Sequence, residues 1–197
     1  MMMNSDGNRK LEIRFAGAGG QGLQAAATIL GKSLIRSTNK YVCQCQNYGP
    51  ESRGGLSYSD LIVSDEEIDF PKIKTPNILV CMSNESFLKF KSELTQGIVT
   101  HLIVDPDMVI VRGVSKGRNS MKVYKIHATI ASEHIFGSRI GSNVVLVGAL
   151  HAILTIGDKT EIEKTLAEEW PALADKNIAA FRRGIELGKQ VKKHEST

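Results

Sequence analysis

The segment 17–22 has the residue types and the spacing of an anion-binding loop. It reads Gly-Ala-Gly-Gly-Gln-Gly and stands between an apolar run at 11–16 and a helix-forming run at 23–35. In the GxGxxG spacing, one glycine allows a tight turn, one a close ligand and one close helix packing. A strand, a glycine turn and a helix in this order can present backbone N–H groups and a helix dipole to an anion. The candidate binding residues are Gly17, Gly19, Gly20, Gln21 and Gly22.

Ordinary dinucleotide binding requires a carboxylate that this chain lacks. In such sites an acidic residue about 20 positions after the loop, at the end of the second strand, holds the ribose hydroxyls. Here residues 41–47 read Tyr-Val-Cys-Gln-Cys-Gln-Asn, and the first carboxylate after them is Glu51. From the residues alone, a loop that only lets the helix pack closely on the sheet explains the glycines as well as ligand binding does.

A second loop carries a group suited to the same chemistry. Residues 48–55 read Tyr-Gly-Pro-Glu-Ser-Arg-Gly-Gly, and the Arg53 guanidinium offers a planar fork of donors to a carboxylate or phosphate. Because this loop follows the second expected strand, we expect it at the same sheet edge as the glycine loop. A tight turn held by a Glu51–Arg53 ion pair is the structural alternative. The candidate binding residues are Tyr48, Glu51, Ser52, Arg53 and Gly54.

The remaining polar and sulfur-containing residues favour structural roles. The histidines have no metal-ligand spacing, and the three cysteines, without a zinc-finger or iron–sulfur spacing, are expected to be reduced and mostly buried. Asp105 is expected in a turn that ends a strand, at a sheet edge that also permits a ligand role. Asn143, at the head of the helix expected at 142–155, is expected to cap that helix, and contact with substrate is the alternative. We therefore expect no metal site and no catalytic residue in this chain.

Strands and helices that alternate along the chain must position the two loops. Hydrophobic periodicity predicts strands at 11–16, 41–46, 56–63, 77–82, 98–104 and 122–126, and helices at 23–35, 85–94, 128–135, 142–155, 160–168 and 176–192. This order predicts an α/β fold of Rossmann-like type, with a mostly parallel sheet flanked by helices and a helical C-terminal part. The run 143–150 is apolar nearly all round, so its helix is either central to the core or covered by a partner.

Length and composition indicate an ordinary globular protein. The 197 residues, 42% hydrophobic and 23% charged, predict a flexible tail at 1–10 and a single domain at 11–193. No apolar run reaches the roughly 18 residues of a membrane helix, and no signal-peptide core is present, so a cytoplasmic location is expected. The net charge of +4 comes from basic and acidic residues spread along the chain, which argues against nucleic-acid binding.

Four segments together resemble the gamma subunit of 2-oxoacid:ferredoxin oxidoreductases. They are residues 17–22, 48–55, 143–150 and 176–184, and the resemblance covers the chain from 11 to 190. Within that family the chain looks most like the gamma subunit of a 2-oxoglutarate:acceptor oxidoreductase. The combination of the first two motifs at this separation is specific, whereas either alone would not be. The resemblance raises the functional interpretation of both loops above the structural one.

This resemblance implies a heteromeric enzyme that oxidatively decarboxylates a 2-oxoacid. Such an enzyme forms an acyl-CoA (succinyl-CoA from 2-oxoglutarate) and CO2, and it delivers electrons to ferredoxin or flavodoxin. The family holds thiamine diphosphate with Mg between its alpha and beta subunits, and iron–sulfur clusters in beta, delta or other parts. This chain has neither a Gly-Asp-Gly thiamine motif nor a CxxCxxCxxxC run, so the implied chemistry lies on partner subunits.

The resemblance implies two roles for this chain: assembly with the alpha and beta subunits, and a position near coenzyme A. The two loops would then either contact coenzyme A, whose phosphates suit a glycine loop and an arginine, or dock onto the alpha and beta subunits. The alternative from another class is an autonomous nucleotide- or CoA-binding regulatory protein. An independent NAD dehydrogenase is disfavoured because the ribose-binding carboxylate is missing.

Overall fold

The computed structural model describes residues 10–48, 55–94, 96, 98–113 and 121–195 of the chain. Its strands are β1 (Lys10–Ala18), β2 (Tyr41–Tyr48), β3 (Leu56–Ser64), β4 (Ile78–Cys81), β5 (His101–Val104) and β6 (Lys122–Lys125). Its α-helices are α1 (Leu23–Ser37), α2 (Asn84–Leu94), α3 (Ala128–Phe136), α4 (Ser142–Leu154), α5 (Lys159–Glu169) and α6 (Ala174–Glu195). The expected alternation of strands with helices, followed by a helical C-terminal part, is confirmed.

The strands form one sheet in the order β2-β3-β1-β4-β5-β6. β1, β4, β5 and β6 run parallel, whereas β3 is antiparallel to both β1 and β2. Only residues 49–55 separate β2 from β3, and a parallel crossover needs a dozen or more residues, so these two strands form a hairpin. The mostly parallel, Rossmann-like sheet is therefore confirmed, with an antiparallel hairpin at one side.

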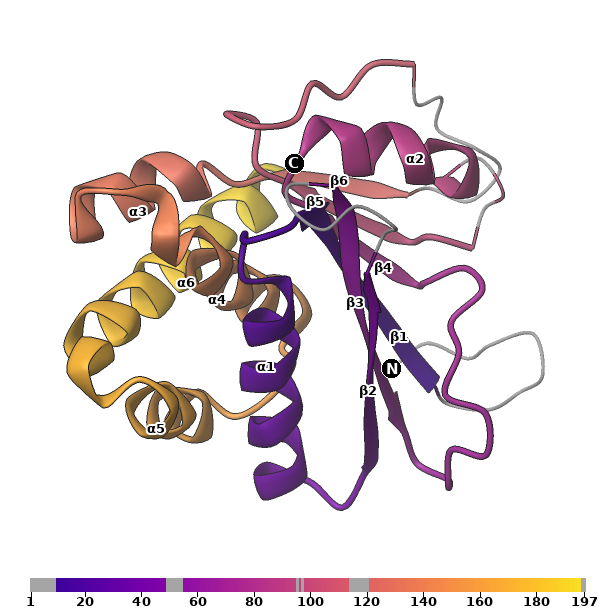
Figure 1. Cartoon of the computed structure of the whole chain (residues 1–197), viewed down its shortest axis with the longest axis horizontal. Helices are drawn as coiled ribbons and strands as arrows, with labels where there is room; N and C mark the ends of the chain where they lie inside the picture. Colours follow the sequence, from indigo (N-terminus) through magenta and orange to yellow (C-terminus); the bar gives the residue numbers. More distant parts are fainter. Residues whose placement is uncertain (1–9, 49–54, 95, 97, 114–120, 196–197) are drawn as a thin grey trace.

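Helices cover both faces of this sheet (Figure 1). α1 and the C-terminal helices lie on one face, over a core cluster that includes Phe15, Leu30 and Leu150. α2 lies on the other face, where Phe87 and Phe90 pack against Leu79 and Leu102. The sheet is thus a middle layer, with apolar side chains directed both ways as parallel strands require.

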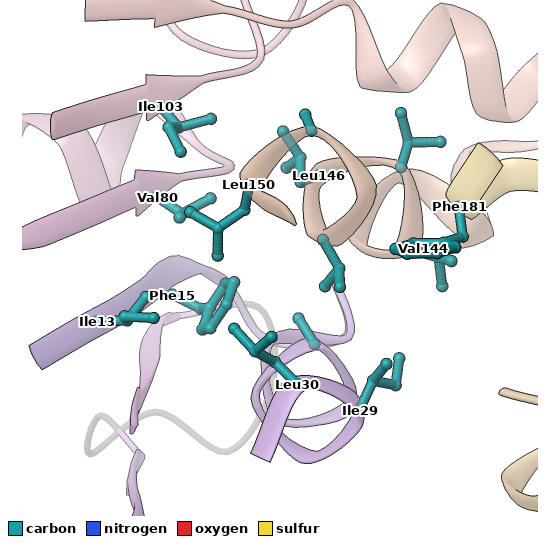
Figure 2. Packing of buried hydrophobic residues seen from close by; sticks show 14 of the residues in the cluster. Ile13, Phe15, Ile29, Leu30, Val80, Ile103, Val144, Leu146, Leu150 and Phe181 are labelled. Carbon is teal, nitrogen blue, oxygen red and sulfur yellow. The ribbon is translucent and has the colours of Figure 1, made fainter. Parts of the chain in front are cut away.

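α4 runs through the centre of the larger core. Every residue from Ser142 to Leu150 is buried, and Figure 2 shows Leu150 reaching toward Val80 and Ile103 of the sheet. The all-round apolar run predicted a helix that is central or covered by a partner, and the central position holds. A helix buried on all sides needs no amphipathic pattern, which explains its sequence.

Several element boundaries differ from the sequence prediction. The first strand extends through Gly17 and Ala18, because these residues still pair with Ser57 and Leu56 of β3. The second strand extends to Tyr48 by pairing with β3 in the same way. The strand expected at 98–104 begins only at His101. Within the described residues, no helix has the length and apolarity to cross a membrane.

The three cysteines are free, but they differ in burial. Cys81 lies in the middle of the sheet and is fully buried, and this burial raises the pKa of its thiol to about 12. Cys43 and Cys45 are only partly buried, because β2 forms the edge of the sheet. The prediction of mostly buried thiols therefore holds for Cys81 alone.

Candidate functional site

The glycine loop joins the end of β1 to the start of α1. Gly20 and Gly22 have φ values of +90° and +72°, in the left-handed region that favours glycine. Gly17 is instead part of β1, where a Cβ atom would lie 2.3 Å from Oε1 of Gln21. The turn therefore depends on Gly20 and Gly22, and Gly17 serves close packing.

Gln21 fastens the loop to the sheet. Its Oε1 accepts a hydrogen bond from the Ala18 N–H at 2.7 Å, and its Nε2 donates to the Met82 carbonyl at 2.8 Å. Both ends of the amide are thus engaged inside the chain. These two hydrogen bonds hold the glycine loop against the carboxyl end of β4. Gln21 is therefore a positioning residue of the loop.

Asn143 of α4 forms a hydrogen bond to the end of the glycine loop. Its Nδ2 donates to the Gly22 carbonyl at 3.1 Å, and a Cβ atom on Gly22 would lie 2.5 Å from that nitrogen. The expectation that Asn143 caps its helix is wrong. Gly141 is the N-cap of α4, without a side-chain hydrogen bond, and Asn143 is already inside the helix. Its side chain joins the start of α1 to α4 instead.

A cavity of about 470 Å³ opens beside the loop. It lies where the carboxyl ends of β1, β4 and β5 meet, which is where open α/β sheets bind ligands. The wall comes from the glycine loop, from the residues that follow β4 and β5, and from the starts of α3 and α4. These lining residues are Ala18, Gly19, Gly20, Gln21, Met82, Ser83, Asp105, Met108, Thr129, Ser138, Arg139, Ile140 and Ser142.

Two helix N-termini and the guanidinium-bearing Arg139 lie at this cavity. A Cβ atom on Gly20 would meet open space, whereas the Gly19 N–H donates to the Gly55 carbonyl at 3.1 Å. α1 and α4 carry no acidic residue in their first turns, so their positive dipole ends are not neutralised there. Arg139 is exposed and makes no side-chain hydrogen bond or ion pair with any described residue. The cavity is therefore suited to an anion.

Asp105 is the one carboxylate among the cavity's lining residues. Its Oδ2 accepts hydrogen bonds at 2.7 Å from both the N–H and the hydroxyl of Thr129, at the start of α3. Its Oδ1 accepts from the Asp107 N–H at 3.1 Å, which confirms the expected turn after a strand. Burial raises the pKa of this carboxyl, and the hydrogen bonds from Thr129 and Asp107 oppose that rise. Both carboxylate oxygens of Asp105 are therefore engaged in hydrogen bonds to the start of α3 and to the turn after β5.

The Arg53 loop begins and ends at the same sheet edge. Tyr48 pairs with Ser57 in the β2–β3 ladder, and the Gly55 carbonyl accepts the hydrogen bond from Gly19. Both ends of the loop therefore lie at the edge of the sheet where the glycine loop lies, as the place after the second strand predicted, and Gly55 contacts Gly19 directly. Four of the predicted binding residues lie outside the described part of the chain: Glu51, Ser52, Arg53 and Gly54.

Several lining residues were not singled out from the sequence. Ser83 directly follows the fourth strand, and the rule that parallel strands end at one sheet edge could have found it. Thr129 stands at the start of α3, and Arg139 begins a short 3-10 helix, Arg139–Gly141, that leads into α4. Nothing local in the sequence shows that these helix starts turn toward the glycine loop.

Three of the described histidines make local contacts. His101 stacks on Tyr124, and its burial together with Lys122 and Lys192 lowers the pKa of its imidazole to about 4. His151 is 2.8 Å from the Ile156 carbonyl, and His127 is 3.0 Å from Asp107. Among the described residues, no three His, Cys, Asp or Glu side chains are grouped to hold a metal ion.

Comparisons with known proteins agree with this architecture. The family model described as pyruvate ferredoxin/flavodoxin oxidoreductase matches residues 12–187. The 2-oxoglutarate synthase subunit KorC of Methanocaldococcus jannaschii is 41% identical over 182 residues, which cover 91% of this chain and 95% of KorC. The Archaeoglobus fulgidus subunit of the same name is 34% identical, with 94% and 91% coverage.

Solved structures extend the likeness to three dimensions. The gamma subunit of a keto/oxoacid ferredoxin oxidoreductase from Geobacter sulfurreducens superposes with a TM-score of 0.77 and 31% identity, covering 92% of this chain and 98% of that one. A 2-oxoglutarate:ferredoxin oxidoreductase chain from Magnetococcus marinus has a TM-score of 0.80 at 20% identity. It covers 92% of this chain and 31% of that one, and the likeness is one of fold. The resemblance seen in the sequence is confirmed, and the chain belongs to the pyruvate ferredoxin/flavodoxin oxidoreductase family.

Proposed function

We propose that this chain is the gamma subunit of a heteromeric 2-oxoglutarate:ferredoxin oxidoreductase that forms succinyl-CoA and CO2. Similarity over nearly the whole length of 2-oxoglutarate synthase subunits supports the choice of 2-oxoacid. Thiamine diphosphate, Mg and the iron–sulfur clusters belong to the alpha, beta or delta partners. Ferredoxin or flavodoxin accepts the electrons, and the complex works in the cytoplasm.

Within this complex, the cavity beside the glycine loop receives the phosphates of coenzyme A. The observation that carries this proposal is the convergence of the glycine loop, the α4 start and Arg139 on one cavity. Two helix N-termini without acidic residues in their first turns attract an anion. The apolar side chains of Met82, Met108 and Ile140 line the same space and suit the uncharged arm of such a molecule.

Arg53 is the proposed second cation of this site. The loop that carries it rejoins the sheet at Gly55, beside Gly19, and a guanidinium binds a phosphate through two parallel hydrogen bonds. Together, Arg53 and Arg139 would hold the phosphates from the two sides of the glycine loop. Chemistry at the acyl carbon stays with the partner subunits.

Replacing Arg53 with alanine should raise the KM for coenzyme A in the assembled enzyme. A charge-assisted hydrogen bond contributes about 1.5–3 kcal/mol, so the expected rise is roughly tenfold or more. Arg139→Ala should act in the same direction, while the KM for 2-oxoglutarate stays the same. Steady-state kinetics of the complex at varied coenzyme A measures both effects.

The matched control is Arg36→Ala. Arg36 is exposed in the last turn of α1, at the end away from the glycine loop, where it pairs with Glu168. The KM for coenzyme A should not respond to that change. An unchanged KM in Arg53→Ala and Arg139→Ala would refute the proposed contact. Loss of the subunit from the complex would show instead that the loops dock onto partner subunits.

A further inference from the structure

The two edges of the sheet are built differently. β6 has four residues, and its two end residues, Lys122 and Lys125, are both exposed. A short strand with lysines is a usual protection against pairing with another chain. β2 has eight residues and pairs with β3 without a bulge from Tyr41 to Tyr48. It contains no charged residue, proline or glycine, so it has none of these protections.

Within the described residues, β2 pairs with β3 alone. Its other side is therefore an edge whose backbone groups can receive a further strand. Hydrogen bonds hold β2 straight from both faces: Thr28 of α1 donates to Gln44 at 3.0 Å, and Cys45 donates to the Pro71 carbonyl at 2.7 Å. The edge is thus long, uncharged and fixed in place.

Exposed apolar side chains flank this edge on both faces. Tyr41, at the start of β2, is 50% exposed, and Phe70, next to the Pro71 that contacts Cys45, is 68% exposed. Ile35 of α1 is 58% exposed and follows Gly31, which packs on β2, by one helical turn. Apolar groups gathered around an open strand are typical of an interface.

We propose that a second copy of this chain covers β2. The two β2 strands would pair antiparallel about a two-fold axis perpendicular to the sheet, joining two six-stranded sheets into one. An antiparallel strand is self-complementary under such an axis, and the absence of charge in β2 removes like-charge repulsion across it. Each copy uses its one unprotected edge, so the assembly closes as a dimer.

The two-fold axis restricts the register of this pair. Directly opposite residues must lie on the same face of the sheet, so the axis passes through a residue pair and not between pairs. If it passes through Gln44, then Cys43 lies opposite Cys45 of the second copy. If it passes through Cys45 or through Cys43, the two copies of that cysteine lie opposite each other. Opposite Cα atoms are about 4.5–5.5 Å apart, within the range that a disulfide spans.

Oxidation of the full-length chain with diamide tests this arrangement. Two thiols, one from each copy, lose two protons and two electrons to diamide and form one disulfide. We expect a reducible covalent dimer on a denaturing gel, from wild type and from the Cys81→Ser control, because Cys81 is buried in the sheet. The double variant Cys43→Ser/Cys45→Ser should give none. If Cys43→Ser alone retains the dimer, the axis passes through Cys45, and if Cys45→Ser alone retains it, the axis passes through Cys43. If each single variant abolishes the dimer, the axis passes through Gln44.

Light scattering measures the dimer without chemical modification. Gln46→Lys places a charge in the exposed part of β2, as β6 does naturally, and should raise the dimer dissociation constant at least tenfold. The matched control is Gln190→Lys, at an exposed position of α6, which should leave it unchanged. A monomeric wild-type chain at micromolar concentrations, or a dimer indifferent to Gln46→Lys, overturns the proposal.

The assembled enzyme gives the remaining test. The same oxidation should again link two copies of this chain, identified by mass spectrometry of the linked peptides. A disulfide from Cys43 or Cys45 to a different subunit would show that a partner's strand covers β2 and would overturn the proposal. Neither outcome depends on the coenzyme A site, so the two proposals fail separately.

Discussion

Replacing Gly184 with alanine is expected to destabilise the chain by about 3 kcal/mol. A Cβ atom on Gly184 would lie 2.0 Å from the Val145 carbonyl oxygen of α4, and one on Gly148 would lie 2.1 Å from the Phe181 carbonyl of α6. Both obstacles are backbone atoms inside helices, so no side-chain rotation relieves them. The helices must separate, and the tightly packed core around Phe181 must open with them.

The sign of this effect makes the test decisive. Alanine favours a helix over glycine by roughly 1 kcal/mol, so an α6 that did not touch α4 closely would gain stability from the substitution. For a chain of this length, a loss of 3 kcal/mol lowers the Tm by roughly 6–12 °C. Thermal unfolding of the full chain measures it, with the exposed Lys189→Ala in the same helix as the control. A raised Tm in Gly184→Ala would contradict the close crossing.

Replacing Asp60 with asparagine should be at least as damaging, at about 3–5 kcal/mol. Arg14 is 3% exposed and binds Asp60 through Nε–Oδ1 at 2.7 Å and Nη2–Oδ2 at 2.8 Å. Its guanidinium lies 4.5 Å from the centre of the Tyr58 ring and 4.9 Å from that of Phe90. Asparagine fills the same space but leaves this buried positive charge without its bidentate partner.

Urea unfolding of Asp60→Asn and of a double variant distinguishes the cost of an unpaired buried charge from the cost of altered packing. Arg14→Met/Asp60→Leu removes the buried guanidinium together with its bidentate partner and should be more stable than Asp60→Asn. Glu93, whose side chain is 20% exposed and lies 3.5 Å from Arg14, loses one contact in the double variant. The exposed Arg183–Glu186 pair provides the control, and Glu186→Gln should cost less than about 1 kcal/mol. If Asp60→Asn lowers the free energy of unfolding by less than about 1 kcal/mol, then Asp60 is not the main partner of the Arg14 charge.

The sequence predicts the elements of this fold well because their signals are local. The glycine loop is recognisable from a strand, closely spaced glycines and a helix, and its place at the carboxyl end of β1 follows directly. α4 is recognisable as a helix that is either central or covered by a partner, because residues 143–150 are apolar nearly all round. The positions of Tyr48 and Gly55, which flank residues 49–54, also follow from the order of the strands.

What the sequence does not reveal depends on contacts between distant segments. Arg14 and Asp60 face each other only because β1 and β3 pair antiparallel in one register, and no pattern near either residue encodes that register. Asn143 has the residue type of a helix cap, yet its side chain is used by Gly22, 121 positions away. Arg139 enters the cavity because α4 packs across the sheet. The positioning residues of the site therefore emerge from tertiary packing.

Purification of the affinity-tagged full-length chain from its own cells tests the central claim most directly. The recovered material is assayed for thiamine diphosphate, for iron and for reduction of ferredoxin by 2-oxoglutarate. We expect larger subunits in fixed ratio to this chain, both cofactors, and electron transfer that requires 2-oxoglutarate and coenzyme A together. Recovery of the chain without thiamine diphosphate and iron, or of an assembly that does not respond to coenzyme A, would contradict its role as the gamma subunit of this enzyme.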